Sequence, residues 1–265
     1  MRVSLSDVEI DVDAAGQAGP VIVLVHGLGG SRKTWGPLLP LLAQSARVYA
    51  PDLRGCGTST RGSKPWTLAQ AADDIDAVAR ALGLSSCVLV GHSLGGVIVE
   101  ELLVRRPPWV AGAVLVSTSS RLSEKATENW RRLAEVVEAK GLSDSPASAA
   151  RGFSEEFAAG HPDVVAAEAR LAATTDAKVY AEQARAASSY DYTDALGSVT
   201  CPVLVVQGLA DRLTPPGGSV LLHRALPAGA RLEMIEGAGH NLPIEMPERI
   251  AALLLRFARE ASHTD

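Results

Sequence analysis

The chain has 265 residues, of which 47% are hydrophobic and 21% charged, and its formal net charge is −5. This length and apolar content suit one α/β domain with an insertion, and the acidic balance provides no basic surface for nucleic acid. Three cysteines are too few for a disulfide framework, and they show no metal-ligand spacing. We therefore expect no metal, no cofactor and no nucleic-acid partner.

The first residues carry no targeting or membrane-spanning pattern. Met1–Asp13 contains four acidic residues and no apolar segment of signal-peptide type, and the run Val21–Val25 is too short to cross a bilayer. We therefore expect a soluble, cytoplasmic protein with no membrane partner. The sequence does not decide whether the protein forms a homodimer.

Short apolar runs alternate with helical patterns in the first part of the chain. Val8–Val12 alternates apolar and acidic residues, which predicts a half-exposed antiparallel strand. Further strands are predicted at Val21–Val25, Arg47–Ala50, Cys87–Val90 and Ala113–Val116, and helices at Thr67–Leu82 and Leu94–Arg106. This alternation predicts a doubly wound, mostly parallel sheet with helices on both faces.

The alternation is interrupted in the middle of the chain. About eighty residues there show helical spacing of apolar side chains and no buried-strand pattern, and a structureless loop of that length would be unusual in a compact domain. We predict a helical cap at 119–199 and a core formed by 1–118 and 200–265. After the cap, strands are predicted at Pro202–Gln207 and Arg231–Ile235, and helices at Ser219–Leu226 and Pro247–Glu260.

The segment Gly91-His92-Ser93-Leu94-Gly95 lies between a predicted strand and a predicted helix. A serine at so tight a junction is typical of a nucleophile elbow, in which flanking glycines let the backbone approach its neighbours. The hydroxyl is then exposed at the carboxyl edge of the sheet, beside a helix N-terminus that favours negative charge. Ser93 is therefore the predicted nucleophile.

An acid and a base follow two later strands. Asp211 and His240 each come after a predicted core strand, and parallel strands end at the same edge of the sheet, so both should lie near Ser93. We predict that His240 takes the Ser93 proton and that Asp211 fixes the imidazole tautomer. The rival carboxylates Asp176 and Asp194 lie in the predicted cap.

A glycine-rich segment, His26-Gly27-Leu28-Gly29-Gly30, follows the strand Val21–Val25. A developing oxyanion needs two N–H donors, and we predict the backbone groups of Leu28 and Leu94. Gly27 and Gly29 would let this backbone come close to a substrate. His26 is expected to brace the loop by hydrogen bonding.

Together these motifs resemble the α/β-hydrolase superfamily. The resemblance rests on His26-Gly27, on Gly91-His92-Ser93-Leu94-Gly95, on Asp211 and Gly239-His240, and on the turn Asp52-Leu53-Arg54-Gly55-Cys56-Gly57. It implies an α/β-hydrolase fold, a mostly parallel doubly wound sheet with a helical cap inserted after the sixth strand. Within the superfamily the chain looks most like 3-oxoadipate enol-lactonases and small carboxylesterases, although Cys56 stands where relatives often carry His.

The resemblance and the residues together imply a serine hydrolase that cleaves a small-molecule carboxylic ester or lactone through an acyl-enzyme. Two alternatives stay open. One is a carbon–carbon hydrolase of ring-cleavage products, which shares the same three residue types. The other is a ligand sensor that uses the fold to bind and hydrolyses slowly.

Substrate contacts are expected from both the cap and the core loops. Besides the glycine-rich loop, the predicted pocket walls are Trp130, Phe153 and Phe157 in the cap, and Leu213 and Leu242 in core loops. Because the sequence shows no cluster of arginines for a dicarboxylate, we expect an apolar ester or lactone.

Overall fold

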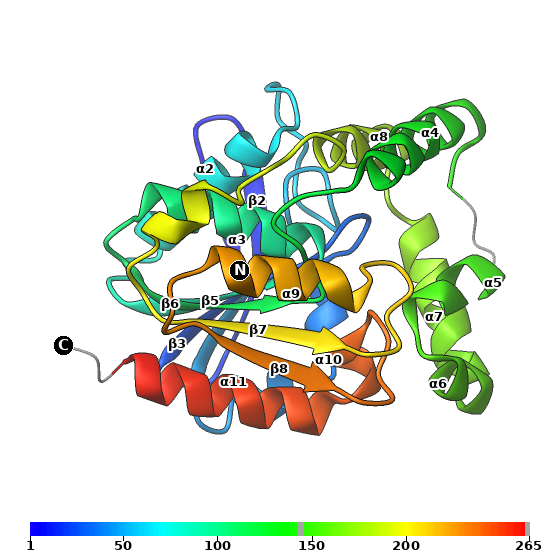
Figure 1. Cartoon of the computed structure of the whole chain (residues 1–265). Coiled ribbons are helices and arrows are strands. Elements are labelled where there is room, and N and C mark those ends of the chain that lie inside the picture. Colours follow the sequence, from blue (N-terminus) through cyan, green and yellow to red (C-terminus); the bar gives the residue numbers. More distant parts are fainter. Residues whose placement is uncertain (143–145, 263–265) are drawn as a thin grey trace.

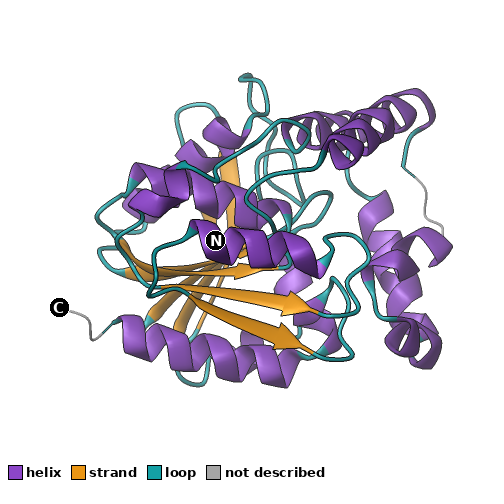
Figure 2. Cartoon of the chain, in the orientation of Figure 1, coloured by secondary structure: helices purple, strands orange, loops and turns teal. Residues whose placement is uncertain are grey.

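The computed structural model describes residues 1–142 and 146–262, so residues 143–145 of the predicted cap and 263–265 of the predicted core lie outside the described residues. An eight-stranded sheet has helices on both faces and further helices at its carboxyl edge (Figures 1 and 2). The strands are β1 (Arg2–Ser4), β2 (Glu9–Ala15), β3 (Val21–Val25), β4 (Arg47–Pro51), β5 (Cys87–His92), β6 (Val110–Val116), β7 (Val203–Gly208) and β8 (Arg231–Ile235). The α-helices are α1 (Leu39–Leu42), α2 (Leu68–Ala81), α3 (Leu94–Arg105), α4 (Glu124–Lys140), α5 (Pro146–Ala149), α6 (Glu155–Gly160), α7 (Pro162–Ala173), α8 (Ala177–Ala186), α9 (Pro216–Ala225), α10 (Leu242–Glu245) and α11 (Pro247–Ala261), and the 3-10 helices are η1 (Arg32–Trp35), η2 (Ala150–Gly152) and η3 (Ala195–Ser198).

The strand order is β1-β2-β4-β3-β5-β6-β7-β8. β1 and β2 pair antiparallel with their neighbours, and all the pairs from β4 to β8 are parallel. The predicted doubly wound, mostly parallel sheet is therefore confirmed. β1 escaped prediction because three residues are too few to show a strand period. No described helix is both long and apolar enough to cross a membrane.

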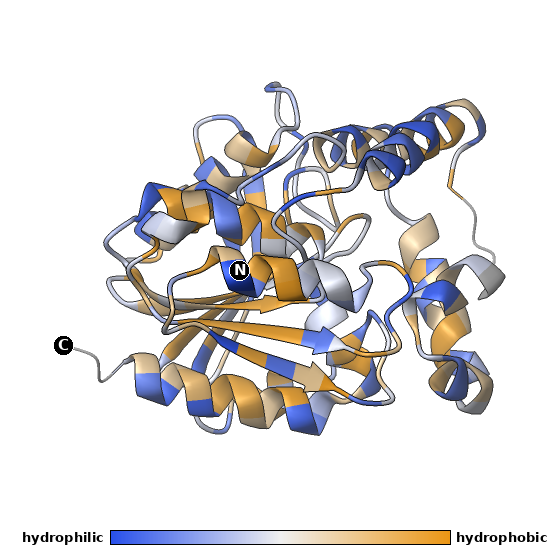
Figure 3. Cartoon of the chain, viewed as in Figure 1, coloured by the Kyte–Doolittle hydropathy of each residue, from blue (hydrophilic) through white to orange (hydrophobic). Residues whose placement is uncertain are grey.

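Two layers of helices cover the sheet. Side chains of α2, α3 and α9 pack on one face, and side chains of α1 and α11 pack on the other. Successive residues of β3 alternate between the two cores, with Val23 and Val25 in one and Ile22 and Leu24 in the other, which explains why this strand is continuously apolar. Figure 3 shows α11 banded by hydrophobic and hydrophilic residues, and its apolar side chains, Phe257 among them, face the sheet.

The helices α4 to α8 are inserted between β6 and β7. α4 and α8 pack on each other, whereas α5 and α6 pack on α7. This second group lies beside the ends of β7 and β8 (Figure 1). The inserted helices therefore stand at the carboxyl edge of the sheet, where the predicted catalytic loops emerge.

The turn between β5 and α3 depends on close backbone contacts. Ser93 has φ 54° and ψ −120°, in the positive-φ region that L-residues seldom adopt. A Cβ at Gly91 would lie 2.4 Å from the Gly95 carbonyl oxygen, and a Cβ at Gly95 would lie 2.1 Å from the Val25 carbonyl oxygen. Only glycine at both positions allows α3 to begin so close to β5 and β3.

We predict that Gly95→Ala lowers the free energy of unfolding by about 1–3 kcal/mol or more, because the new methyl group overlaps backbone that cannot move away cheaply. Gly217→Ala is the matched control, since a Cβ at Gly217 in α9 meets nothing within 4 Å. That variant should be unchanged or more stable by up to about 1 kcal/mol. Urea denaturation of both variants measures the difference, and equal stabilities would contradict the packing argument.

Candidate active site

Ser93 lies at the head of α3, where the chain leaves β5. Its backbone N–H donates to the Val116 carbonyl, 2.9 Å away, which ties the turn to β6. The Leu94 N–H is in the first turn of α3, where an N–H has no acceptor within the helix. In the described part of the chain, the Leu28 N–H makes no hydrogen bond either. Both predicted oxyanion donors are thus free to bind an acceptor atom.

Asp211 and His240 form a buried pair at the ends of β7 and β8. The Nδ1 atom of His240 lies 2.8 Å from Oδ2 of Asp211, and both residues are buried. The other carboxylate oxygen, Oδ1, accepts hydrogen bonds of 2.8 Å from the backbone N–H groups of Leu213 and Thr214. The loop that follows β7 therefore fixes the carboxylate in the orientation that contacts the imidazole.

The Asp211 carboxylate is held ionised against the cost of burial. Burial by itself would raise the pKa of Asp211, but the charge of His240 and hydrogen bonds from His240, Thr214 and Gln207 together lower it. An ionised Asp211 favours a proton on Nδ1 of His240 and leaves the other ring nitrogen as the acceptor.

Three residues that support this pair were not predicted in that role from the sequence. Gln207, which is fully buried, donates from Nε2 to Oδ2 of Asp211 at 3.0 Å. The His240 carbonyl accepts hydrogen bonds of 2.9 Å from Ser117 Oγ and from His92 Nε2. The one signal in the sequence was the polar Gln207 at the end of an otherwise apolar strand.

The histidines beside the elbow and the glycine-rich loop are structural. Leu53 N–H donates to Nε2 of His26 at 2.9 Å, so this ring nitrogen carries no proton and Nδ1 donates to the Gly27 carbonyl, also at 2.9 Å. His26 therefore braces the loop, as expected. Burial lowers the pKa of His26, and burial with the neighbouring His240 lowers that of His92 to about 3.

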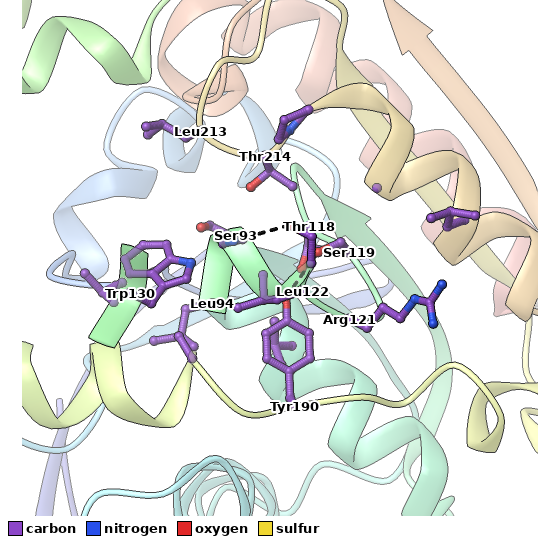
Figure 4. Close-up of a pocket in the computed structure, with 18 of the residues that line it drawn as sticks. Ser93, Leu94, Thr118, Ser119, Arg121, Leu122, Trp130, Tyr190, Leu213 and Thr214 are labelled. Carbon is purple, nitrogen blue, oxygen red and sulfur yellow. Dashed lines mark hydrogen bonds between the residues drawn. The ribbon is translucent and has the colours of Figure 1, made fainter. Parts of the chain in front are cut away.

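Two cavities meet at Ser93. The larger has a volume of about 500 Å³ and the smaller about 350 Å³, and both are lined by Leu28, Trp130 and Leu213. Figure 4 shows the larger one, with Trp130 and Leu94 on one side of Ser93 and Thr118 and Ser119 on the other. His240, Gly27 and Gly29 line the smaller cavity.

Three predicted pocket residues lie elsewhere. Phe153, Phe157 and Leu242 are not among the residues that line either cavity. Phe153 is fully buried, and its ring stacks on that of Phe157 at 5.3 Å between centroids. Leu242 packs in the core on the face of the sheet that α1 and α11 cover. The segment inserted between β6 and β7 instead contributes Tyr190 to the larger cavity and Tyr180 to the smaller one.

The rival carboxylates lie outside the site. Asp176 caps α8 by accepting hydrogen bonds from the backbone of Lys178 and Val179. Asp194 precedes η3 and lines neither cavity beside Ser93. Within 1–142 and 146–262, no group of three or more His, Cys, Asp or Glu side chains is arranged to hold a metal ion.

Comparison with known proteins places the chain in a family. A family model for the alpha/beta hydrolase fold matches residues 20–247. The chain belongs to the α/β-hydrolase family. This α/β-hydrolase is a hydrolytic enzyme of that fold, as its similarity to enzymes in the same family shows.

Similar proteins include both curated relatives and solved structures. The α/β-hydrolase is 31% identical over 259 residues to the protein named "Putative carbamate hydrolase RutD" of Escherichia coli O9:H4 strain HS, covering 92% of this chain and 93% of the relative. It is 27% identical to 3-oxoadipate enol-lactonase 1 of Acinetobacter baylyi, covering 91% and 89%. A thermophilic esterase from Thermogutta terrifontis superposes with a TM-score of 0.90 at 29% identity, covering 98% of this chain and 99% of that one.

Proposed function

We propose that this α/β-hydrolase cleaves a carboxylic ester or lactone through an acyl-enzyme, with Ser93, His240 and Asp211 as its catalytic triad. The observation that carries the proposal is the 2.8 Å contact between Asp211 and His240 at a cavity that also reaches Ser93. A buried carboxylate on one ring nitrogen prepares the other nitrogen to take a proton from a serine hydroxyl.

The chemistry follows the usual course of acyl transfer. His240 takes the Ser93 proton as Oγ attacks the carbonyl carbon, and the electron pair of the broken π bond moves to the carbonyl oxygen. The N–H groups of Leu28 and Leu94 stabilise that oxyanion. The intermediate collapses and expels the alkoxide, which takes the proton from His240. Water then repeats the sequence on the acyl-enzyme and releases the acid.

The substrate class rests on the relatives and on the charges of the cavity walls. An esterase and an enol-lactonase are among the similar proteins. Arg121 and Glu124, of opposite charge, line the larger cavity, whereas Glu168 is the carboxylate that lines the smaller one beside His240. No Lys or Arg in the described part of the chain lines the smaller cavity. We therefore propose an ester or lactone that is neutral near its leaving group, with the cap helices setting the choice of substrate.

Ser93→Ala should lower kcat for the best ester or lactone by about 10³-fold or more, because the nucleophile is lost. Asp211→Asn should lower kcat by about 10²- to 10⁴-fold, since an amide favours the wrong imidazole tautomer. Steady-state kinetics on short-chain esters and lactones measure both. Rapid wild-type turnover supports an enzyme of this class, and tight binding with very slow turnover would support the sensor instead.

Asp194→Asn is the matched control for the acid, because Asp194 is a carboxylate of the cap that lines neither cavity beside Ser93. Its kcat should stay within about twofold of the parent value. A large loss in Asp194→Asn with little loss in Asp211→Asn would show that the acid lies in the cap.

We predict that kcat/KM falls at acid pH with the slope of a single proton. A general base that already carries a proton cannot accept the one from Ser93, so the reaction requires an unprotonated base. His92 adds no second step, since its pKa is lowered to about 3, and burial also lowers the pKa of His26. A pH–rate profile with a neutral substrate tests this, and an acid limb that needs two protons would contradict it.

Glu168 should discriminate against anionic substrates. Burial raises the pKa of Glu168, so the carboxyl repels an anion more strongly as the pH rises and it ionises. Glu168→Gln should then raise kcat/KM for an ester with a terminal carboxylate by about 3- to 10-fold relative to its neutral counterpart. Glu156→Gln, an exposed position of α6 away from both cavities, controls for net charge. Equal effects of Glu168→Gln on both esters would refute this role.

A further inference from the structure

The glycine-rich loop that carries Leu28 is a tight turn. Gly30 N–H donates to the Gly27 carbonyl at 3.1 Å, so Leu28 and Gly29 occupy its two central positions. Gly29 has φ +65°, a conformation that costs a glycine little and other residues more. The direction of the Leu28 N–H is therefore set by the peptide planes of this turn. A contact that fixes the next two peptide groups, Leu28–Gly29 and Gly29–Gly30, therefore also fixes the direction of the Leu28 N–H.

Residues in and just before α8 form hydrogen bonds with both of these peptide groups. Gly29 N–H donates to Oε1 of Gln183 in α8 at 3.0 Å, across 154 residues of sequence. Thr175, just before α8, donates from Oγ1 to the Gly29 carbonyl at 2.8 Å. The ring of Tyr180 covers the same glycine, since a Cβ at Gly29 would lie 2.5 Å from it. Three cap residues thus contact one residue of the loop.

The Gln183 amide has one orientation that satisfies its surroundings. The residue is fully buried, and its Nε2 donates to Sγ of Cys56 at 3.0 Å. Burial raises the pKa of the Cys56 thiol to about 12, so the sulfur stays neutral and accepts weakly. With Nε2 directed at Cys56, Oε1 must face the Gly29 N–H. A flipped amide would oppose two donors and leave a buried N–H without an acceptor.

We propose that Gln183 is a positioning residue for the oxyanion hole, and that Gln183 and Thr175 hold the turn so that the Leu28 N–H faces the reacting carbonyl. The proposal rests on the triad function proposed above. Docking of α8 on the core then completes the catalytic site. Because an oxyanion hole acts mainly on the transition state, the loss of this support should lower kcat rather than raise KM.

The test removes the hydrogen-bond acceptor at position 183 and keeps a side chain of similar volume. Gln183→Met should lower kcat by about 10- to 100-fold, less than or equal to the loss of a whole oxyanion donor, with KM changed by no more than about threefold. The affinity for a boronic acid that forms a tetrahedral adduct with Ser93 should fall by a similar factor. Thr175→Val, at a half-buried position, should show the same pattern more weakly. It provides the test of the proposal if Gln183→Met does not fold.

Arg185→Gln is the matched control on the same helix, because Arg185 pairs with Glu138 on α4 and touches neither Gly29 nor Cys56. It should keep the parent kcat and the parent affinity for the boronic acid. A folded Gln183→Met or Thr175→Val variant that is less stable but retains kcat and boronic acid affinity would overturn the proposal. Turnover by Ser93→Ala would instead refute the triad itself, so the two failures are distinguishable.

Discussion

The close approach of α3 to β5 and β3 is the constraint on which the active site depends. Gly91 and Gly95 carry no Cβ, and this lets the helix begin directly behind the nucleophile turn. Ser93 accepts a positive φ at that turn, and the surrounding strands prevent it from relaxing. As a result, Ser93 and the first residue of α3, Leu94, lie at the carboxyl edge of the sheet and line the same cavity.

The acid–base pair is rigid for a different reason. Asp211 and His240 lie on loops, but the Asp211 carboxylate, Nδ1 of His240 and the His240 carbonyl are each held by hydrogen bonds. Gln207 and the backbone of the β7 loop hold the carboxylate, while Ser117 and His92 hold the backbone of His240. Buried hydrogen bonds of this kind specify one arrangement more strictly than apolar packing does.

The cap contributes to the site in two distinct ways. The pair α4 and α8 reaches the core through Gln183 and through Val179, whose side chain lies against Gly55. Side chains of α4, α5 and α7 line the smaller cavity, among them Trp130 of α4 and Glu168 of α7. Under the proposed function, Gln183 of α8 bears on the geometry of catalysis, whereas the side chains of α4, α5 and α7 that line the smaller cavity bear on which substrate enters.

The sequence alone determined the features that depend on short-range patterns. Alternation of strands and helices, and the glycines around Ser93, predicted the sheet and the place of the elbow, and a residue directly after a strand must lie at its carboxyl edge. The cap could not be resolved in this way. Phe153 and Phe157 share a helical spacing that does not distinguish a pocket wall from packing, and in the structure they stack on each other. Gln183 likewise reaches Gly29 across 154 residues. Which face of a cap helix meets the core is decided by non-local packing, and no local pattern in the sequence records it.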